Sequence, residues 1–530
     1  MKKLLILTSM AALAACNAGE GMEPPPPMPP PPVEMPPPPP SPVPPPPPAP
    51  MMMVAPAPED RERYADTPPN PVKRVAEEPV STFSVDVDTG SYSNVRRFLR
   101  QGELPPSDSV RVEEMLNYFR YDYPLPADRR RPFSVSTHVS TTPWNPNSRL
   151  LRIGLRGYDL PRSERPPANL VFLVDTSGSM NETDKLPLVK RTLSLLADQL
   201  GPNDKVAIVA YASQVGLVLE PTNDAARIKA ALDQLKAEGS TAGGAAIETA
   251  YETARSARIA DGINRIMLAT DGDFNVGISD TERLKDLVRR NRDDGITLTT
   301  LGFGQGNYNE AMMEQIADVG NGNYAYIDSD DEARKVLGEE LSSTLFTIAQ
   351  DVKIQVEFNP ATVSEYRLIG YENRILREED FTNDRTDAGD IGAGHMVTAL
   401  YEIVPAGRPG WLLERRYEAN RPQGAARPAS ELAFLQLRYK LPGEEKSSLI
   451  AAPIPASAIA SARPPSGDMA FAAGVAAFGQ RLKGDERLGD FGWVGIRQLL
   501  GSQSDPWRRE LLTLIDAAAA LDPKGTGPAR

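Results

Sequence analysis

The chain has 530 residues, a formal net charge of −13 and 40% hydrophobic residues. This length predicts about two to four domains, with enough apolar residues to form their cores. The acidic balance argues against nucleic acid as a partner, because a phosphate-binding surface needs clustered Lys and Arg.

The N-terminus has the order of a secretory signal peptide, which we assign to residues 1–15. Two lysines precede an apolar run that is shorter than the about 20 residues of a membrane-spanning helix. The sequence Leu-Ala-Ala-Cys, which ends at Cys16, resembles a bacterial lipobox, and this resemblance implies cleavage before Cys16 and lipid attachment to it. Cys16 is the only cysteine. The lipid would anchor the chain in the cell envelope. In Gram-negative lipoproteins a residue other than Asp after the cysteine usually indicates the outer membrane, and Asn17 stands at this position. A secreted protein with an unrelated cysteine is the alternative.

Residues 16–78 are predicted to be a disordered, proline-rich tether. Proline dominates Pro24–Pro58 and cannot support a strand ladder or a packed core. A polyproline helix rises about 3.1 Å per residue, so this segment could extend for about 110 Å. We interpret it as a spacer between the membrane and a folded body; a ligand for a proline-recognising domain is the alternative.

A first folded region, the N-terminal flanking domain, is expected at residues 79–164. Residues 110–119 have the pattern of a short helix. Residues 132–140 and 150–158 alternate apolar and polar side chains, which predicts strands with one apolar face each.

Residues 165–346 alternate strands with helices, which is typical of a doubly wound, mostly parallel sheet with helices on both faces. The first strand, NLVFLV, is apolar throughout and ends at Asp175. Further strands are expected at KVAIVAY, VGLVLE, NRIMLAT, GITLTTLGFG and NYAYID. Helices are expected at 185–200, 224–236, 244–258 and 280–293, and from Asp330.

A β-rich C-terminal module is expected at residues 347–460, because apolar residues again recur at every second position. This pattern predicts a sandwich-like module. We hypothesise that the strands of 132–158 complete this module and that the α/β domain is inserted into it. Residues 461–530 are rich in Ala and Leu and are predicted to be helical, with a break near 484–492.

Oxygen-bearing side chains follow the ends of the buried strands. Asp175, Ser177 and Ser179 occupy alternate positions in a loop, Thr241 lies in a Gly-rich loop before a helix, and Asp271 follows another strand. Ligands of doubly wound sheets bind outside the carboxyl ends of the strands, so these loops are expected to converge. Oxygen ligands suit a hard divalent cation such as Mg²⁺. The alternative is that Asp175 caps a helix and the serines stabilise a turn.

The sequence DTSGSM from Asp175, the Thr in a Gly-rich loop and TDG around Asp271 resemble the metal ion-dependent adhesion site of von Willebrand factor type A domains. The resemblance implies a six-stranded, mostly parallel sheet with one short antiparallel edge strand. It also implies a bound Mg²⁺, or Mn²⁺ or Ca²⁺, with an open position for a partner's carboxylate. The implied metal ligands are Asp175, Ser177, Ser179, Thr241 and Asp271. The flanking sequences STFSVDVDTGSYSNVRRFL, GYENR and DAGDIGAGHMVTALYE resemble the bacterial YfbK-like lipoprotein subgroup of this family.

Other motifs are given structural interpretations. DVDTGS at 86–91 resembles the active-site motif of an aspartic protease, but a pepsin-like chain would carry a second copy and none occurs. We interpret it as a turn and a helix cap. His138 and His395 are the only histidines, so zinc and Ser–His sites are not expected, and His395 is interpreted as structural. GFGQG at 302–306 is interpreted as a turn.

The sequence therefore predicts a binding protein of the cell envelope and not an enzyme. Its partner would be a protein or another envelope component that offers an Asp or Glu carboxylate to the metal. One alternative is an envelope assembly or scaffold protein that acts through its flanking domains. A metal-assisted hydrolase is the second alternative, which we disfavour because no general base is expected at the site.

Overall fold

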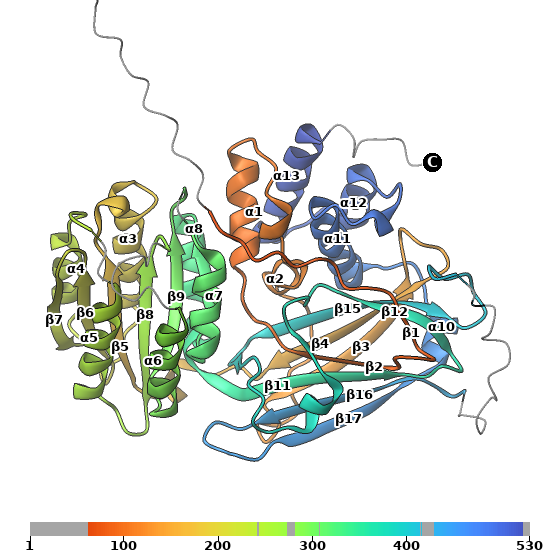
Figure 1. Cartoon of the computed structure of the whole chain (residues 1–530), viewed down its shortest axis with the longest axis horizontal. Coiled ribbons are helices and arrows are strands. Elements are labelled where there is room, and N and C mark those ends of the chain that lie inside the picture. Colours follow the sequence, from red (N-terminus) through yellow and green to blue (C-terminus); the bar gives the residue numbers. More distant parts are fainter. Residues whose placement is uncertain are drawn as a thin grey trace, which may run out of the picture. The chain divides into compact units, whose positions relative to one another are not determined.

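Figure 1 shows the computed structural model, which describes residues 62–240, 243–272, 281–306, 308–413, 415 and 429–522. Cys16 and Thr241 lie outside the described residues. Lys73–Arg74 (β1) already pairs with Val363–Ile369 (β12), so packed structure begins before residue 79, earlier than the sequence suggests.

The α/β region forms the predicted six-stranded sheet, in the order β10-β9-β8-β5-β6-β7. Its strands are β5 (Ala168–Asp175), β6 (Lys205–Tyr211), β7 (Val215–Thr222), β8 (Ile263–Thr270), β9 (Thr297–Phe303) and β10 (Tyr324–Ile327). All pairs are parallel except β6–β7. The edge strand β7 is therefore antiparallel as expected, but at eight residues it is as long as the central strand and not short.

Helices cover both faces of this sheet. The helices are α3 (Leu186–Ala197), α4 (Ala225–Gln234), α5 (Gly243–Ser256), α6 (Thr281–Asp293), α7 (Glu310–Val319), α8 (Asp330–Arg334) and α9 (Leu341–Leu345). Alternate residues of β5 point to opposite faces: Phe172 packs in the cluster that includes α3 and α4, and Leu173 packs with α5, α6 and α7. Because β5 is buried on both faces, its residues form an unbroken apolar run.

The flanking strands form an antiparallel sandwich. One sheet has the order β1-β12-β15-β4-β3 and the other β13-β2-β11-β16-β17, with β14 paired to β11. These strands are β2 (Val80–Ser84), β3 (Phe133–Thr141), β4 (Arg149–Gly157), β11 (Thr347–Phe358), β13 (Ile375–Leu376), β14 (Ile391–Gly392), β15 (Met396–Pro405), β16 (Glu431–Lys440) and β17 (Ser448–Pro455). Strand β4 pairs with β15 along eight residue pairs. The hypothesis that strands from both sides of the α/β region complete one module is thereby confirmed.

A helical cluster joins the N-terminal segment to the C-terminal helices. It contains α1 (Gly90–Arg100), α2 (Val112–Asn117), α11 (Gly467–Leu482), α12 (Trp493–Leu500) and α13 (Pro506–Leu521), and a short α10 (Ser457–Ser461) precedes α11. Arg96 of α1 is buried and pairs with Glu332 of α8 at 2.8 Å and with Glu510 of α13 at 3.0 Å. The buried charge of Arg96 therefore connects the helical cluster to the α/β region, and apolar contacts connect the helical cluster to the sandwich.

The DVDTGS segment differs from its predicted role as a turn and helix cap. The turn is present, because Asp88 N donates to Asp86 Oδ1 at 2.9 Å. Thr89 precedes α1 but makes no side-chain capping hydrogen bond. Asp88 instead accepts a hydrogen bond from Tyr324 N at 2.8 Å, and both acids are buried. These carboxylates are thus internal charges at the junction with β10, which the local pattern did not indicate.

Candidate metal centre

The carboxylate of Asp175 is held at the carboxyl end of β5. It is fully buried, and its Oδ1 accepts the backbone N–H of Ser177 at 2.9 Å. Its Oδ2 accepts the hydroxyls of Thr270 at 2.9 Å and of Tyr211 at 3.3 Å. Burial raises the pKa of Asp175 to about 6, the hydrogen bond from the Ser177 backbone opposes this rise, and the nearby charge of Asp271 adds to it. The side chain is therefore fixed in orientation by the ends of β6 and β8.

Asp271 and the two serines lie at the same edge of the sheet. Strands β5 and β8 are parallel neighbours, so the residues that follow them emerge together. Asp271 is fully buried, and Ser177 is almost fully buried. The Oγ atoms of Ser177 and Ser179 are 3.0 Å apart, within the loop and short 3₁₀ turn (Gly178–Asn181) after β5. Two carboxylates and two hydroxyls thus gather where the sequence predicted an oxygen-ligand site.

The loop that leads to Thr241 is hydrogen-bonded to the loop after Asp175. Gly178 N donates to Gly239 O at 2.9 Å, and Glu238 N donates to Thr176 O at 2.8 Å. Gly239 lies two residues before Thr241. Because Thr241 is outside the described residues, its role as a ligand stays a prediction.

Lys185 is a site residue that our sequence analysis missed. Its Nζ lies 2.9 Å from Asp271 Oδ2, and its side chain is buried. Gly304 of the GFGQG segment has a φ of +70°, and a Cβ at this position would clash with the Lys185 stem. The GFGQG segment therefore forms a turn and also lets the backbone at Gly304 lie close to the Lys185 side chain. The only local signal was a lysine placed directly before α3.

The segment after Asp271 contacts the start of α7. Gly272 has a φ of +88°, and a Cβ there would lie 2.6 Å from Asn309 N. Asn309 caps α7 through a hydrogen bond from Met312 N to its Oδ1, at 3.3 Å. A side chain at Gly272 would therefore displace either the Asp271 loop or the N-terminus of α7.

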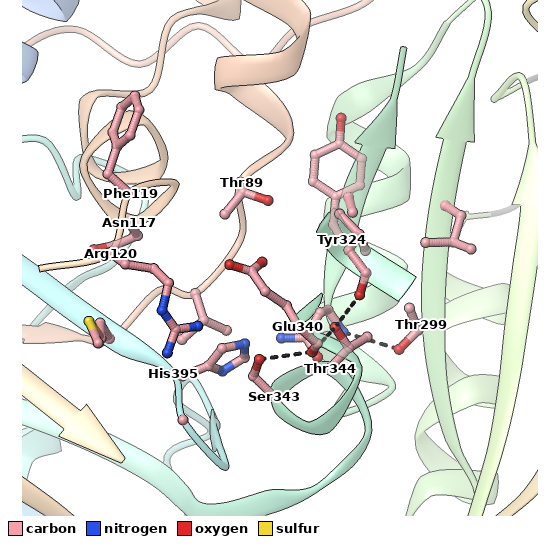
Figure 2. A pocket seen from close by; sticks show the side chains of 17 residues that line it. Thr89, Asn117, Phe119, Arg120, Thr299, Tyr324, Glu340, Ser343, Thr344 and His395 are labelled. Atoms are coloured by element: carbon pink, nitrogen blue, oxygen red, sulfur yellow. Dashed lines mark hydrogen bonds between the residues drawn. The ribbon is translucent and has the colours of Figure 1, made fainter. Parts of the chain in front are cut away.

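A pocket of about 40 Å³ lies between the α/β region and the sandwich. Figure 2 shows the side chains that line it. His395 and Ser343 line it, but the Ser343 hydroxyl donates to Glu340 O at 2.8 Å. His395 Nδ1 accepts the N–H of Gly392 at 3.0 Å, and burial lowers the pKa of His395 to about 4. His395 is therefore a neutral residue that stabilises the turn before β15, in agreement with its structural interpretation.

Comparison with known proteins decides the family. "Uncharacterized protein YfbK" of Escherichia coli (strain K12) is 48% identical over 468 residues, which cover 86% of this chain and 81% of the relative. The chain belongs to the YfbK family. The family models agree: "von Willebrand factor" matches residues 58–152, "von Willebrand factor type A domain" matches 169–340, and "Uncharacterized protein YfbK, C-terminal" matches 343–521. The doubly wound sheet of this YfbK-family chain is thus a type A domain.

Two solved structures resemble parts of the YfbK-family chain. A von Willebrand factor type A protein from Catenulispora acidiphila matches 67% of this chain and 80% of its own, with 16% identity and a TM-score of 0.37. Proximal thread matrix protein 1 from the mussel byssus, described with a zinc-occupied MIDAS motif, matches 35% of this chain and 46% of its own, with 20% identity and a TM-score of 0.27. Among the described residues, no helix has the length and apolar character needed to cross a membrane.

Proposed function

We propose that this YfbK-family chain is a lipid-anchored binding protein of the cell envelope, whose type A domain binds a partner's Asp or Glu carboxylate through a divalent cation. The observation that carries the proposal is the gathering of Asp175, Ser177, Ser179 and Asp271 at one edge of the sheet. The hydrogen bonds that tie the loop before Thr241 to the Asp175 loop support the fifth ligand.

The donor set fits a hard cation. All of its side chains offer oxygen, and the two carboxylates are buried. Asp175, Ser177, Ser179, Thr241 and Asp271 would hold Mg²⁺, with Mn²⁺ and Ca²⁺ as alternatives. When bound, the cation would offer an open coordination position to a carboxylate. Lys185 offsets part of the negative charge on Asp271, which would lower the affinity of the site for a cation.

The proposal includes a lipid anchor and a binding role without catalysis. Lipid on Cys16 would attach the chain to the envelope, in the outer membrane of a Gram-negative cell, and the proline-rich segment would carry the folded part away from the bilayer. The partner would be a protein or another envelope component. We propose binding without turnover, because the groups that donate to Asp175 are the backbone N–H of Ser177 and the hydroxyls of Thr270 and Tyr211, with no described imidazole among them.

Crosslinking in intact cells, with and without EDTA, tests this proposal. The full chain should capture a partner in a chelator-sensitive manner, and Asp175→Ala should abolish capture. Asp233→Ala is the matched control, because Asp233 is an exposed acid of the same domain, on α4. Partner capture that is unchanged both by EDTA and by Asp175→Ala would refute the metal-dependent mechanism.

Crosslinking and a separate turnover assay distinguish the alternatives. An assembly or scaffold role predicts capture through residues 350–530 that persists in EDTA. A metal-assisted hydrolase predicts turnover of ester or peptide substrates that is lost with Asp175→Ala.

A further inference from the structure

A second group of acids lies where the flanking segments meet the type A domain. Asp86 follows β2, Glu114 lies on α2 and Glu314 lies on α7. Each offers a carboxylate oxygen, and the three oxygens lie within 4.8 Å of one another. All three residues are buried. We call these three residues the junction acids; they come from both sides of the contact between the type A domain and its flanks.

Acidic groups outnumber basic groups around the junction acids. Six carboxylates of this region are buried, namely Asp86, Asp88, Glu113, Glu114, Glu310 and Glu314. Two arginines, Arg111 and Arg374, are the cations that the described residues place in contact with the junction acids. Burial of unpaired carboxylates is costly, because an isolated charge loses its hydration.

Arg374 pairs with two of the three junction acids. Its Nε lies 2.9 Å from Asp86 Oδ2, and its Nη2 lies 2.9 Å from Glu314 Oε1. Arg111 contacts Glu114 and Glu314 only weakly. Its Nε is 3.6 Å from Glu114 Oε1 and its Nη2 is 3.6 Å from Glu314 Oε2, and neither contact is a hydrogen bond.

A buried oxygen without a donor points to a missing positive partner. Glu114 Oε2 accepts the N–H of Ser91 at 2.8 Å, but within the described ranges Glu114 Oε1 makes no hydrogen bond. Glu310 is fully buried and lies one helical turn before Glu314, on the same face of α7. Burial raises the pKa of Glu114, and the charges of Asp86 and Glu310 add to this rise. An unpaired buried acceptor is destabilising, and more so if it is charged.

We propose that Asp86, Glu114 and Glu314 form a second site for a divalent cation, which joins the type A domain to its flanking module. Three convergent carboxylates suit a hard cation with oxygen ligands, such as Ca²⁺ or Mn²⁺. Arg374 also lines an open cavity of about 240 Å³, so a cation could enter by displacement of this side chain. This site uses none of the five residues of the first metal centre.

Protons are the competing explanation for the same oxygens. Burial raises the pKa of Glu314 to about 7 and that of Glu310 to about 8. A cluster that shares protons would gain stability as the pH falls and would not respond to cations. At about pH 8 the two explanations therefore differ, because only the metal site predicts that added cations raise the melting temperature.

Metal titration of the full chain with Asp175→Ala, which lacks the first centre, tests the second site. We expect this variant to bind one Mn²⁺ or Ca²⁺ per chain in calorimetry and to melt at a higher temperature with the metal. Adding Glu314→Gln should weaken binding by at least about tenfold. Adding Glu113→Gln, which removes a neighbouring buried carboxylate outside the junction acids, should have a smaller effect.

Two results would overturn the second site. The first is an Asp175→Ala chain that binds neither Mn²⁺ nor Ca²⁺ and whose melting temperature responds only to pH. The second is binding that Glu314→Gln leaves unchanged. If Glu314→Gln fails to fold, Asp86→Asn serves in its place, with the same expected loss of affinity.

Discussion

Replacing Arg374 with Met should strongly destabilise the folded chain. Its guanidinium lies 2.9 Å from carboxylate oxygens of both Asp86 and Glu314. It also contacts Asp88, at 3.4 Å, and Asp318. A charge pair at this distance contributes about 6 kcal/mol at an effective dielectric constant of about 20, before desolvation is subtracted. Loss of one partner of a buried pair costs about 3–5 kcal/mol, a large part of the about 5–15 kcal/mol that stabilises a domain.

The cost of Arg374→Met should depend on pH. Burial raises the pKa of Glu314 to about 7 from its ordinary value of 4.5, and without the guanidinium it should rise further. Between these values the folded state binds a proton that the unfolded state does not, so stability falls as the pH rises through this window. The deficit of the variant should therefore be larger at about pH 8 than at about pH 5.5.

Urea unfolding followed by circular dichroism, in EDTA at both pH values, measures this deficit. Arg377→Met is the matched control, because the Arg377 side chain is 74% exposed and pairs with Asp380 at 3.0 Å. An exposed pair is worth less than about 1 kcal/mol. The reasoning would be refuted by an Arg374→Met deficit no larger than that of the control, or by one that is larger at about pH 5.5.

Two further predictions concern the metal centre and a buried acid. Lys185→Met removes the ammonium group that lies 2.9 Å from Asp271 Oδ2. Mn²⁺ binding measured by calorimetry should become at least about tenfold tighter, because a repulsion of about 1–4 kcal/mol between this group and the metal is lost. Unchanged affinity, or an equal gain in the surface variant Lys229→Met, would contradict this prediction. Burial raises the pKa of Asp390 to about 8 from 3.8, so wild-type stability should fall as the pH rises between these values. Asp390→Asn should remove up to about 1.4 kcal/mol per pH unit of this slope, measured as melting temperature against pH, and equal slopes in both chains would contradict it.

Several elements were predictable because their signals are local. The apolar run of β5, the alternation in β15 and the DTSGSM loop each depend on neighbouring residues. Helix α7 was missed although Asn309 caps it and Met313, Ile316 and Ala317 are buried on it. Its first turn carries Glu310, a fully buried carboxylate, so a single apolar stripe was not evident.

The sequence by itself determined the strands and most helices of the type A region, its mostly parallel sheet and the loops that carry Asp175, Ser177, Ser179 and Asp271. Strand period and loop chemistry are encoded over a few residues. Tertiary structure alone decided which distant segments meet. The pairing of Lys185 with Asp271, and of Arg374 with Asp86 and Glu314, joins residues between 60 and 288 positions apart. Such contacts depend on how the chain packs within the type A domain and between this domain and its flanks. The cost of burying these charges is evident only once the packing is known.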